Sequence, residues 1–260
     1  MKSDRISQIK HLLLQKKSIQ NDELCRHFGV SIATIRRDLD KLEEEGFIRR
    51  FYGGAQISDH LPLSPLGAIE QWDMRAVTNV PEKRAMAELV AAQIPDHCTV
   101  LLDSGTTVFE VARCLIHRKN LTVLTNSLTT AAMLGACPDL QVYCIGGLIK
   151  TDMLATSGIL SAECLSFFPT VDISVFSADS YVATRGIMAY SMELAMLKKA
   201  IAERSDTVIA AVDHTKFGLS AGVTTCPTRN LHMLVTDSGA PPEDLEYTRH
   251  CGVKVLVANV

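Results

Sequence analysis

The chain has 260 residues, of which 47% are hydrophobic, and its formal net charge is −3. This apolar content excludes wholesale disorder, and no apolar run approaches the length of a membrane span. The opening stretch MKSDRISQIK contains no hydrophobic signal segment, so we expect a cytoplasmic protein. The eight cysteines are scattered without a C-x-x-C pair, which favours reduced thiols and gives little support to a zinc site. We expect no metal and no cofactor.

The charge is unevenly distributed along the chain. Residues 1–55 carry 11 Lys and Arg against 8 Asp and Glu, whereas the remainder carries 15 against 21. The split indicates two parts with different partners. We predict a small basic domain over residues 1–57, a linker or docking segment over 58–80, and a larger domain over 81–260.

Three helical patterns follow one another in the first 45 residues. Apolar residues repeat at helical spacing over 6–13, a short second pattern covers 22–28, and Ser31 is placed to cap a third helix that runs to about Glu45. A glycine separates the second pattern from the third. Two helices joined by a short glycine turn are the helix-turn-helix arrangement.

The third helix is predicted to have a packing side and an outward side. At about 100° per residue, Ile35, Leu39 and Leu42 fall on one side, and Ala33 and Arg37 point away from it. A recognition helix offers its N-terminal residues to the major groove, where an arginine can donate two hydrogen bonds to a guanine. The candidate DNA contacts on this helix are Ser31, Ala33, Thr34, Arg36, Arg37 and Lys41.

The stretch FIRRFYGGAQI predicts a short strand, a glycine turn and a return strand, which together form a wing. Arg49, Arg50 and Tyr52 on this wing are placed to contact phosphates or the minor groove. The alternative is an ordinary charged surface, because basic runs are usually only solvated.

The segment VSIATIRRDLDKLEEEGFIRRFYGGA resembles the signature of the DeoR family of bacterial transcription regulators. The match includes the run T-I-R-R-D-L and the later G-G-A. The family's usual histidine before the two glycines is Tyr52 here. The resemblance implies a winged helix-turn-helix that binds double-stranded operator DNA.

From Pro81 onward, helical patterns alternate with continuous apolar strands. The predicted strands begin with TVLLD, LTVLT and LQVYCI and continue with DISVFS, TVIAAV, HMLVT and VKVLVA. Strands of this kind between helices predict an α/β fold with a parallel sheet covered on both faces.

Small polar residues and glycines follow three successive predicted strands. Ligands gather at the carboxyl ends of parallel strands, and a helix N-terminus there favours a phosphate, so these turns suggest an anion pocket. For each turn alone, simple helix capping is the alternative. The candidate effector-binding residues are Asp103, Ser104, Gly105, Thr106, Thr107, Thr125, Asn126, Ser127, Gly146 and Gly147, with Asp179, Lys198 and Lys216 as further candidates.

This half resembles the DeoR-family sensor domain, whose fold is similar to ribose-5-phosphate isomerase. The stretches LLDSGTT, LTVLTNSL, CIGG, LKKA and VDHTKFG carry the resemblance, and FSADSY stands where the family often has F-x-G-A-D-G. The resemblance implies that a phosphorylated sugar or related metabolite binds at the three turns, helped by Lys198 and Lys216.

Together, these features predict a transcription regulator rather than an enzyme. We expect a repressor of a carbohydrate-metabolism operon, a dimer or tetramer that does not associate with membranes. The alternative is a sugar-phosphate isomerase with an added helical domain. The related isomerase carries a K-G-G-G-A motif, and VATRGIMAYSM occupies the comparable region here. A third hypothesis is a protein–protein adaptor, but it leaves the polar turns unexplained.

Overall fold

The computed structural model describes residues 2–16, 18–44, 47–51, 53–57, 72–219 and 222–260. The chain divides into two compact units, Met1–Gly67 and Ala68–Val260. The second unit includes part of the segment 58–80 that was predicted as a linker or docking segment. Residues 72–77 are helical, and the following helix α5 already begins at Val80.

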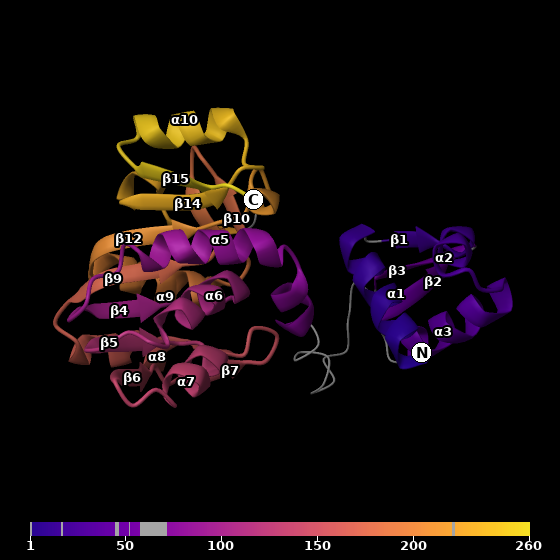
Figure 1. Ribbon diagram of the computed structural model, residues 1–260, viewed down its shortest axis with the longest axis horizontal. Helices are drawn as coiled ribbons and strands as arrows, with labels where there is room; N and C mark the ends of the chain where they lie inside the picture. The colour runs from indigo at the N-terminus through magenta and orange to yellow at the C-terminus, as the bar shows by residue number, and fades with distance from the viewer. Residues whose placement is uncertain (1, 17, 45–46, 52, 58–71, 220–221) are drawn as a thin grey trace. The chain divides into compact units, whose positions relative to one another are not determined.

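The first unit is a winged helix. Antiparallel pairing joins its three short strands in the order β1-β3-β2, so the predicted wing is present as β2 and β3 (Figure 1). The elements are α1 (Lys2–Lys16), β1 (Ser18–Gln20), α2 (Asn21–Phe28), α3 (Ile32–Glu44), β2 (Ile48–Phe51) and β3 (Gly54–Ile57).

Helix α3 packs as its apolar spacing predicts. Ile35, Leu39 and Leu42 are fully buried in the core of this unit together with Leu24 from α2. Asp38 lies on the buried side as well, and its carboxylate accepts a hydrogen bond from Arg5 Nε of α1 at 2.7 Å. The packed side and this ion pair fix the orientation of α3, so its opposite side faces outward.

The second unit is built on a parallel sheet of seven strands in the order β15-β14-β12-β9-β4-β5-β6. All seven predicted strands are present, which confirms the predicted α/β fold. Their bounds are β4 (Thr99–Leu102), β5 (Leu121–Thr125), β6 (Leu140–Cys144), β9 (Val171–Phe176), β12 (Ser205–Ala211), β14 (Met233–Asp237) and β15 (Lys254–Ala258).

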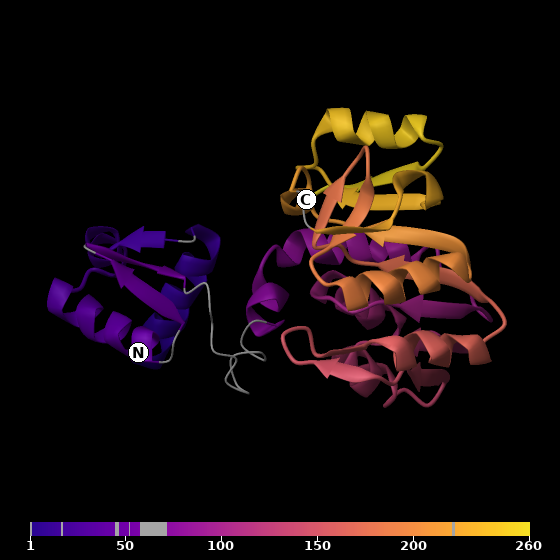
Figure 2. The same cartoon turned by 180° about the vertical axis from the view of Figure 1, so that it is seen from behind.

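Helices cover both faces of this sheet. Helices α5 (Val80–Ala91), α6 (Thr106–Leu115) and α7 (Leu128–Leu134) cover one face, and α9 (Met192–Glu203) and α10 (Pro242–His250) cover the other. Accordingly, α5 is nearer the viewer in Figure 1 and α9 in Figure 2. Successive strand residues alternate between two buried clusters: Val100 and Leu102 belong to the first, and Leu101 to the second. This explains why the strands have continuous apolar sequences.

Several short elements were not predicted from the sequence. They are the hairpin β7 (Leu148–Lys150) and β8 (Ala155–Ser157), helix α8 (Ile159–Cys164) with the turn η1 (Leu165–Phe167), the small sheet β10 (Ser180–Val182), β11 (Gly186–Ala189) and β13 (Val223–Cys226), and the turns η2 (His214–Lys216) and η3 (Thr228–Asn230). Within the described ranges, no helix combines the length and the apolar character needed to cross a membrane.

Candidate nucleic-acid interface and effector pocket

The outward side of α3 carries the basic side chains that the sequence placed there. Ser31 caps the helix: its Oγ accepts the Thr34 backbone N–H at 3.3 Å and lies 3.0 Å from Thr34 Oγ1. Ala33, Arg36 and Arg37 are exposed, as is Lys41 further along the helix. In the described part of the chain, neither Arg36 nor Arg37 has a hydrogen-bond or ion-pair partner. Their guanidinium groups are therefore free to meet an anionic partner.

The wing differs from the prediction in one respect. Arg49 is exposed, but Arg50 forms an ion pair with Asp40 of α3, and its backbone N–H donates to Glu43 Oε1 at 3.0 Å. Arg50 therefore ties the wing to α3, because its charge is already paired within the protein. Tyr52, the third predicted wing contact, lies outside the described residues.

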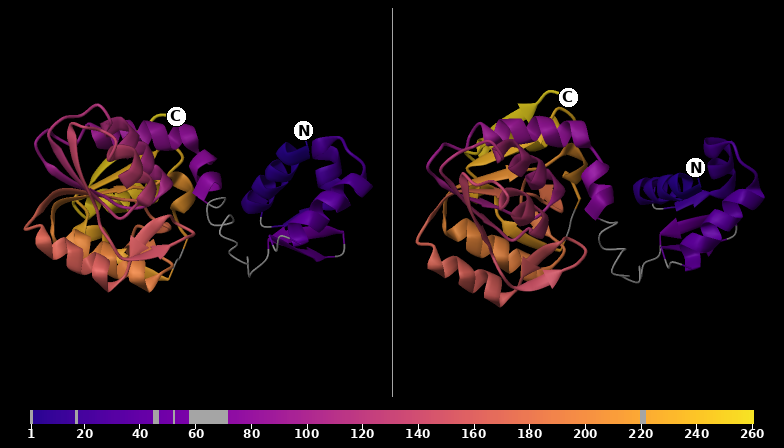
Figure 3. Two further views of the ribbon diagram at one scale, coloured as in Figure 1. Left: turned by 90° about the horizontal axis from the view of Figure 1, so that it is seen from below. Right: turned by 60° about the horizontal axis from the view of Figure 1, so that its bottom comes forward.

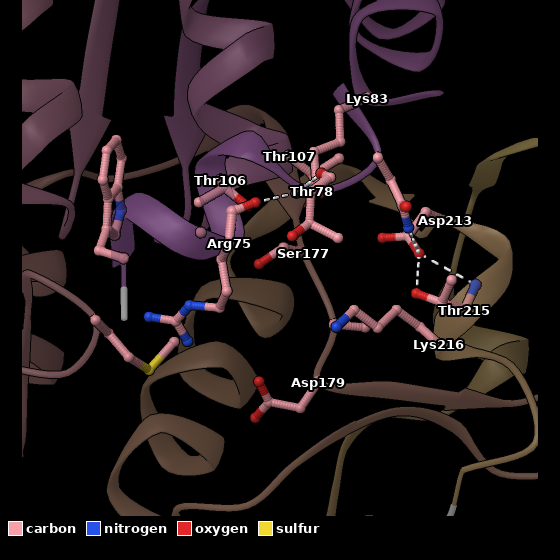
Figure 4. Close-up of a pocket in the computed structure, with 15 residues that line it drawn as sticks. Arg75, Thr78, Lys83, Thr106, Thr107, Ser177, Asp179, Asp213, Thr215 and Lys216 are labelled. Atoms are coloured by element: carbon pink, nitrogen blue, oxygen red, sulfur yellow. Dashed lines mark hydrogen bonds between the residues drawn. The ribbon is translucent and has the colours of Figure 1, made fainter. Parts of the chain in front are cut away.

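A pocket opens at the carboxyl ends of the central strands of the second unit (Figure 4). Its walls come from residues 72–83, the β4–α6 turn, the residues after β9 and the residues after β12, with Met153 from the β7–β8 hairpin. Of the residues predicted to bind an effector, it brings together Gly105, Thr106, Thr107, Asp179 and Lys216.

The start of helix α6 forms one wall of the pocket. Thr106 and Thr107 are its first two residues, and Gly105 precedes them with φ 129°, a conformation that side-chain-bearing residues rarely adopt. A Cβ at Gly105 would lie 2.4 Å from Ser177 Oγ, whose hydroxyl donates to the Ser104 carbonyl at 2.7 Å. Glycine is therefore required here, and the first N–H groups of α6 have no carbonyl partner inside the helix.

Three basic side chains line the same pocket: Arg75, Lys83 and Lys216. The buried Lys83 ammonium donates to the carbonyls of Arg75 and Thr78 at 2.5 and 2.8 Å, and burial lowers its pKa from 10.5 to about 8. Arg75 donates to the Asp152 carbonyl, and burial lowers its pKa as well. In Figure 4, the Lys216 ammonium extends toward the middle of the pocket, and it has no hydrogen bond or ion pair to any described residue.

Two carboxylates accompany these cations. Asp213 is held by its neighbours: Oδ1 accepts the Thr215 N–H at 3.1 Å and the Asn79 amide at 3.4 Å. Asp179 accepts the Tyr190 backbone N–H at 3.1 Å. The pocket therefore offers both hydrogen-bond acceptors and a net excess of positive charge, which suits a ligand with an anionic group and hydroxyls.

Asp103 and Lys198, both predicted to bind an effector, lie outside the lining of this pocket. They form a buried pair, with Lys198 Nζ 2.5 Å from Asp103 Oδ2 and 2.7 Å from the Ser177 carbonyl. Burial raises the pKa of Asp103, and the Lys198 ammonium opposes that shift. The pair ties α9 to the end of β4. The adjacent Ser104 is also buried and outside the pocket lining.

The residues of the other two polar turns also lie outside the pocket lining, and they make contacts within the fold. Asn126 donates to the Thr156 carbonyl at 3.2 Å and accepts the Thr156 N–H on its own carbonyl at 2.8 Å, which fastens β8 to the end of β5. Ser127 caps α7 by accepting the Thr130 N–H at 3.2 Å. The remaining residues of these turns, Thr125, Gly146 and Gly147, likewise do not line the pocket; a Cβ at Gly147 would lie 2.1 Å from Ser161 Oγ.

Residues that the candidate set omitted supply most of the pocket's positive charge. Arg75 and Lys83 come from the predicted linker and the first helix after it, and Trp72 packs edge-to-face on Phe109 at 5.3 Å between ring centroids. The sequence gave only a weak indication of their role, because Trp72 and Arg75 stand in a segment without hydrophobic periodicity. In the described residues, no group of three or more His, Cys, Asp or Glu is arranged to hold a metal ion.

The fold and these two surfaces define a class: a winged helix-turn-helix protein with an α/β sensor domain. The DeoR-like helix-turn-helix domain matches residues 5–60, and the DeoR C-terminal sensor domain matches residues 78–238. The chain belongs to the DeoR family of transcriptional regulators.

Curated relatives over nearly the whole chain are regulators and repressors. The chain is 32% identical to the regulator GolR of Listeria innocua over 98% of both chains and 32% identical to IolR of Bacillus subtilis over 96% of both. It is also 32% identical to the glycerol-3-phosphate regulon repressor of Escherichia coli over 92% of both. Among solved structures, ribose 5-phosphate isomerase A from Methanocaldococcus jannaschii has a TM-score of 0.41 at 15% identity, over 54% of this chain and 55% of that one.

Proposed function

We propose that this DeoR-family chain represses transcription by inserting α3 into the major groove of an operator. The position of Arg37 is the main observation that supports this proposal. It lies on the side of α3 opposite Ile35, Leu39 and Leu42, and its charge has no partner among the described residues. In that position it can donate two hydrogen bonds to a guanine, while exposed Arg36 and Arg49 are placed for phosphates.

We propose further that the pocket binds a phosphorylated small metabolite that controls DNA binding. Lys216 and Arg75 supply cations, the start of α6 supplies N–H donors, and Asp179 and Asp213 are acceptors for hydroxyl groups. One relative is named for a glycerol-3-phosphate regulon, which supports a phosphorylated effector of the same class for this chain. For such a ligand to release the operator, it must bind the DNA-free form more tightly.

The DNA-binding proposal is tested by selecting duplexes from a randomised pool with the full-length protein. We then expect Arg37→Ala to cost about 1–3 kcal/mol of binding and to relax discrimination at one base position. Lys119→Ala removes the same charge from an exposed site in the second unit and should bind as the wild type does. Unchanged sequence preference in Arg37→Ala would contradict the assignment of this face.

The effector proposal is tested by thermal shift with phosphorylated and unphosphorylated forms of the same sugars, because a ligand of the folded state raises Tm. Only the phosphorylated forms should stabilise the protein, and Lys216→Ala should show a smaller increase in Tm at the same ligand concentration. Lys254→Ala, at an exposed lysine on β15, should show the wild-type increase. Equal responses to both forms would contradict a phosphate site.

The alternative is catalysis of sugar-phosphate isomerisation. An isomerase needs a general base placed against the substrate and a group that stabilises the enediolate oxygen. Here Asp179 already accepts the Tyr190 N–H, and the relatives are named regulators and repressors. We propose binding without turnover. Sustained conversion of ribose 5-phosphate to ribulose 5-phosphate by the purified protein would overturn that choice.

A further inference from the structure

A second cavity opens in the second unit, separate from the pocket of Figure 4. It has a volume of about 310 Å³ and shares no lining residue with that pocket. Its walls come from the turn between β10 and β11, from the turn η3 and from the C-terminal half of α10. We name this cavity the arginine cleft and define it by Arg185, Thr228, Arg229 and Tyr247.

Two of these walls are fastened to each other. Gly186 has φ 112°, and a Cβ there would lie 2.7 Å from the Thr228 backbone nitrogen, so only glycine allows this close approach. The buried Thr228 hydroxyl donates to the Ala183 carbonyl at 2.6 Å. The two turns that carry Arg185 and Arg229 are therefore held side by side.

Helix α10 is fastened to the same hairpin. Tyr181 of β10 is fully buried, and its hydroxyl lies 2.7 Å from Thr248 Oγ1 of α10. Tyr181 also belongs to the buried cluster that contains Leu197 of α9 and Leu245 of α10, so the hairpin packs on the face of the sheet opposite α5. Figure 3 shows α5 and α9 on these two faces. The cleft is thus already formed without a ligand, and binding requires little further ordering of the backbone.

The arginine cleft is positively charged. Arg185 and Arg229 are both exposed, and neither guanidinium has a hydrogen bond or ion pair to any residue that the structure describes. No Asp or Glu is among the described residues that line the cavity. Two like charges at one cavity repel each other, and an anion bound between them would replace that repulsion with attraction.

The neighbouring side chains indicate which kind of anion fits. A guanidinium group binds phosphate through two parallel N–H donors, so a pair of arginines suits a phosphate group. Tyr247 is 45% exposed and offers an aromatic ring on which a planar ring of a ligand can stack. The pocket of Figure 4 has carboxylates that suit sugar hydroxyls, whereas the arginine cleft has an aromatic ring instead.

We propose that the arginine cleft binds a nucleoside monophosphate, with the phosphate between Arg185 and Arg229 and the base against Tyr247. The cavity volume of about 310 Å³ is within the range of small-molecule sites, about 300–1,000 Å³. The proposal goes beyond the proposed function and does not depend on it, because no residue of α3 or of the pocket of Figure 4 takes part.

The test is calorimetric titration of the full-length protein with each of the four nucleoside 5′-monophosphates. We expect at least one of them to bind with a dissociation constant below about 1 mM, and its nucleoside without phosphate not to bind. The double variant Arg185→Gln/Arg229→Gln should raise that constant at least about tenfold, and Tyr247→Ala should raise it severalfold. Circular dichroism and Tm establish that these variants fold, since all three substituted residues are exposed.

The matched control is Arg204→Gln/Arg249→Gln, which removes two exposed arginines of the second unit outside the cleft lining. It should keep the wild-type affinity, as should Lys216→Ala in the pocket of Figure 4.

Several results would overturn the proposal. None of the four monophosphates binds, the nucleoside binds equally well, or the folded double variant keeps the wild-type affinity. An equal loss in the control double variant would show only an effect of overall charge. A loss in Lys216→Ala alone would place the nucleotide in the other pocket, and unchanged affinity in Tyr247→Ala would remove the base contact and with it the nucleotide assignment.

Discussion

Asp179 lines the pocket of the second unit and accepts the backbone N–H of Tyr190 at 3.1 Å, and Tyr190 is 69% exposed. A second connection runs through the β7–β8 hairpin. Met153 in its turn lines the pocket, and the preceding Asp152 carbonyl accepts a hydrogen bond from Arg75. Both connections join the pocket to exposed segments of the second unit, so a ligand that contacts Asp179 or Arg75 would alter the partners that hold Tyr190 and the hairpin.

Gly105 gives a prediction about the shape of the pocket. Gly105→Ala places a methyl group 2.4 Å from Ser177 Oγ and 3.0 Å from Ser177 Cβ, so either the Ser177 hydroxyl must leave the Ser104 carbonyl or the start of α6 must shift. We expect loss of the ligand-induced Tm shift and a lower free energy of unfolding. Gly252→Ala is the control, because Gly252 also has positive φ but open space around it. Backbone strain in Gly252→Ala should lower the free energy of unfolding by about 1 kcal/mol, and the ligand-induced Tm shift should remain. Equal behaviour of the two variants would contradict a steric role for Gly105.

The buried pair of Asp103 and Lys198 gives a prediction about stability. Lys198→Met leaves the Asp103 carboxylate buried without a counter-charge, which should cost about 3–5 kcal/mol in a urea unfolding experiment. Lys199→Met changes the next residue of α9, whose ammonium is exposed, and should cost less than about 0.5 kcal/mol. Adding Asp103→Leu to Lys198→Met should recover part of the loss. A small effect of Lys198→Met would mean that the pair contributes little to holding α9 against the sheet.

Much of the fold could be predicted because its signals are local. Strand β5 has the bounds of the predicted run LTVLT, and Ser31 caps α3 as its position before the helix suggests. Parallel strands buried on both faces are continuous apolar runs, so the seven-stranded sheet was visible in the sequence. The Gly105–Thr106–Thr107 turn was placed in a pocket for the same reason, because it directly follows such a strand.

The rest of the pocket depends on contacts between distant segments. Lys198 is 95 residues from Asp103, and the sequence did not indicate that this lysine would neutralise the strand-end carboxylate instead of a ligand. Arg75 lies in a segment without hydrophobic periodicity, and Lys83 lies just after it. Only folding brings these two side chains into the same pocket as the start of α6. The tie between Arg50 and Asp40 was hidden because a basic residue on a wing has the same pattern whether its charge is paired or free.

The lowered pKa of Lys83 predicts that ligand binding depends on pH. Burial lowers its pKa to about 8, so in the free protein it is protonated below about pH 8 and loses its charge above that value. A phosphate ester, whose second pKa is about 6, is mostly a dianion throughout this range, so its affinity should fall as pH rises through about 8, when the nearby cation disappears. Calorimetric titrations between about pH 7 and 9.5 measure this step. Lys83→Arg keeps a charge that does not titrate in this range and should remove the step. Lys216→Met should weaken binding at every pH and keep the step, which separates the two lysines. A step of equal size in Lys83→Arg would show that another group titrates.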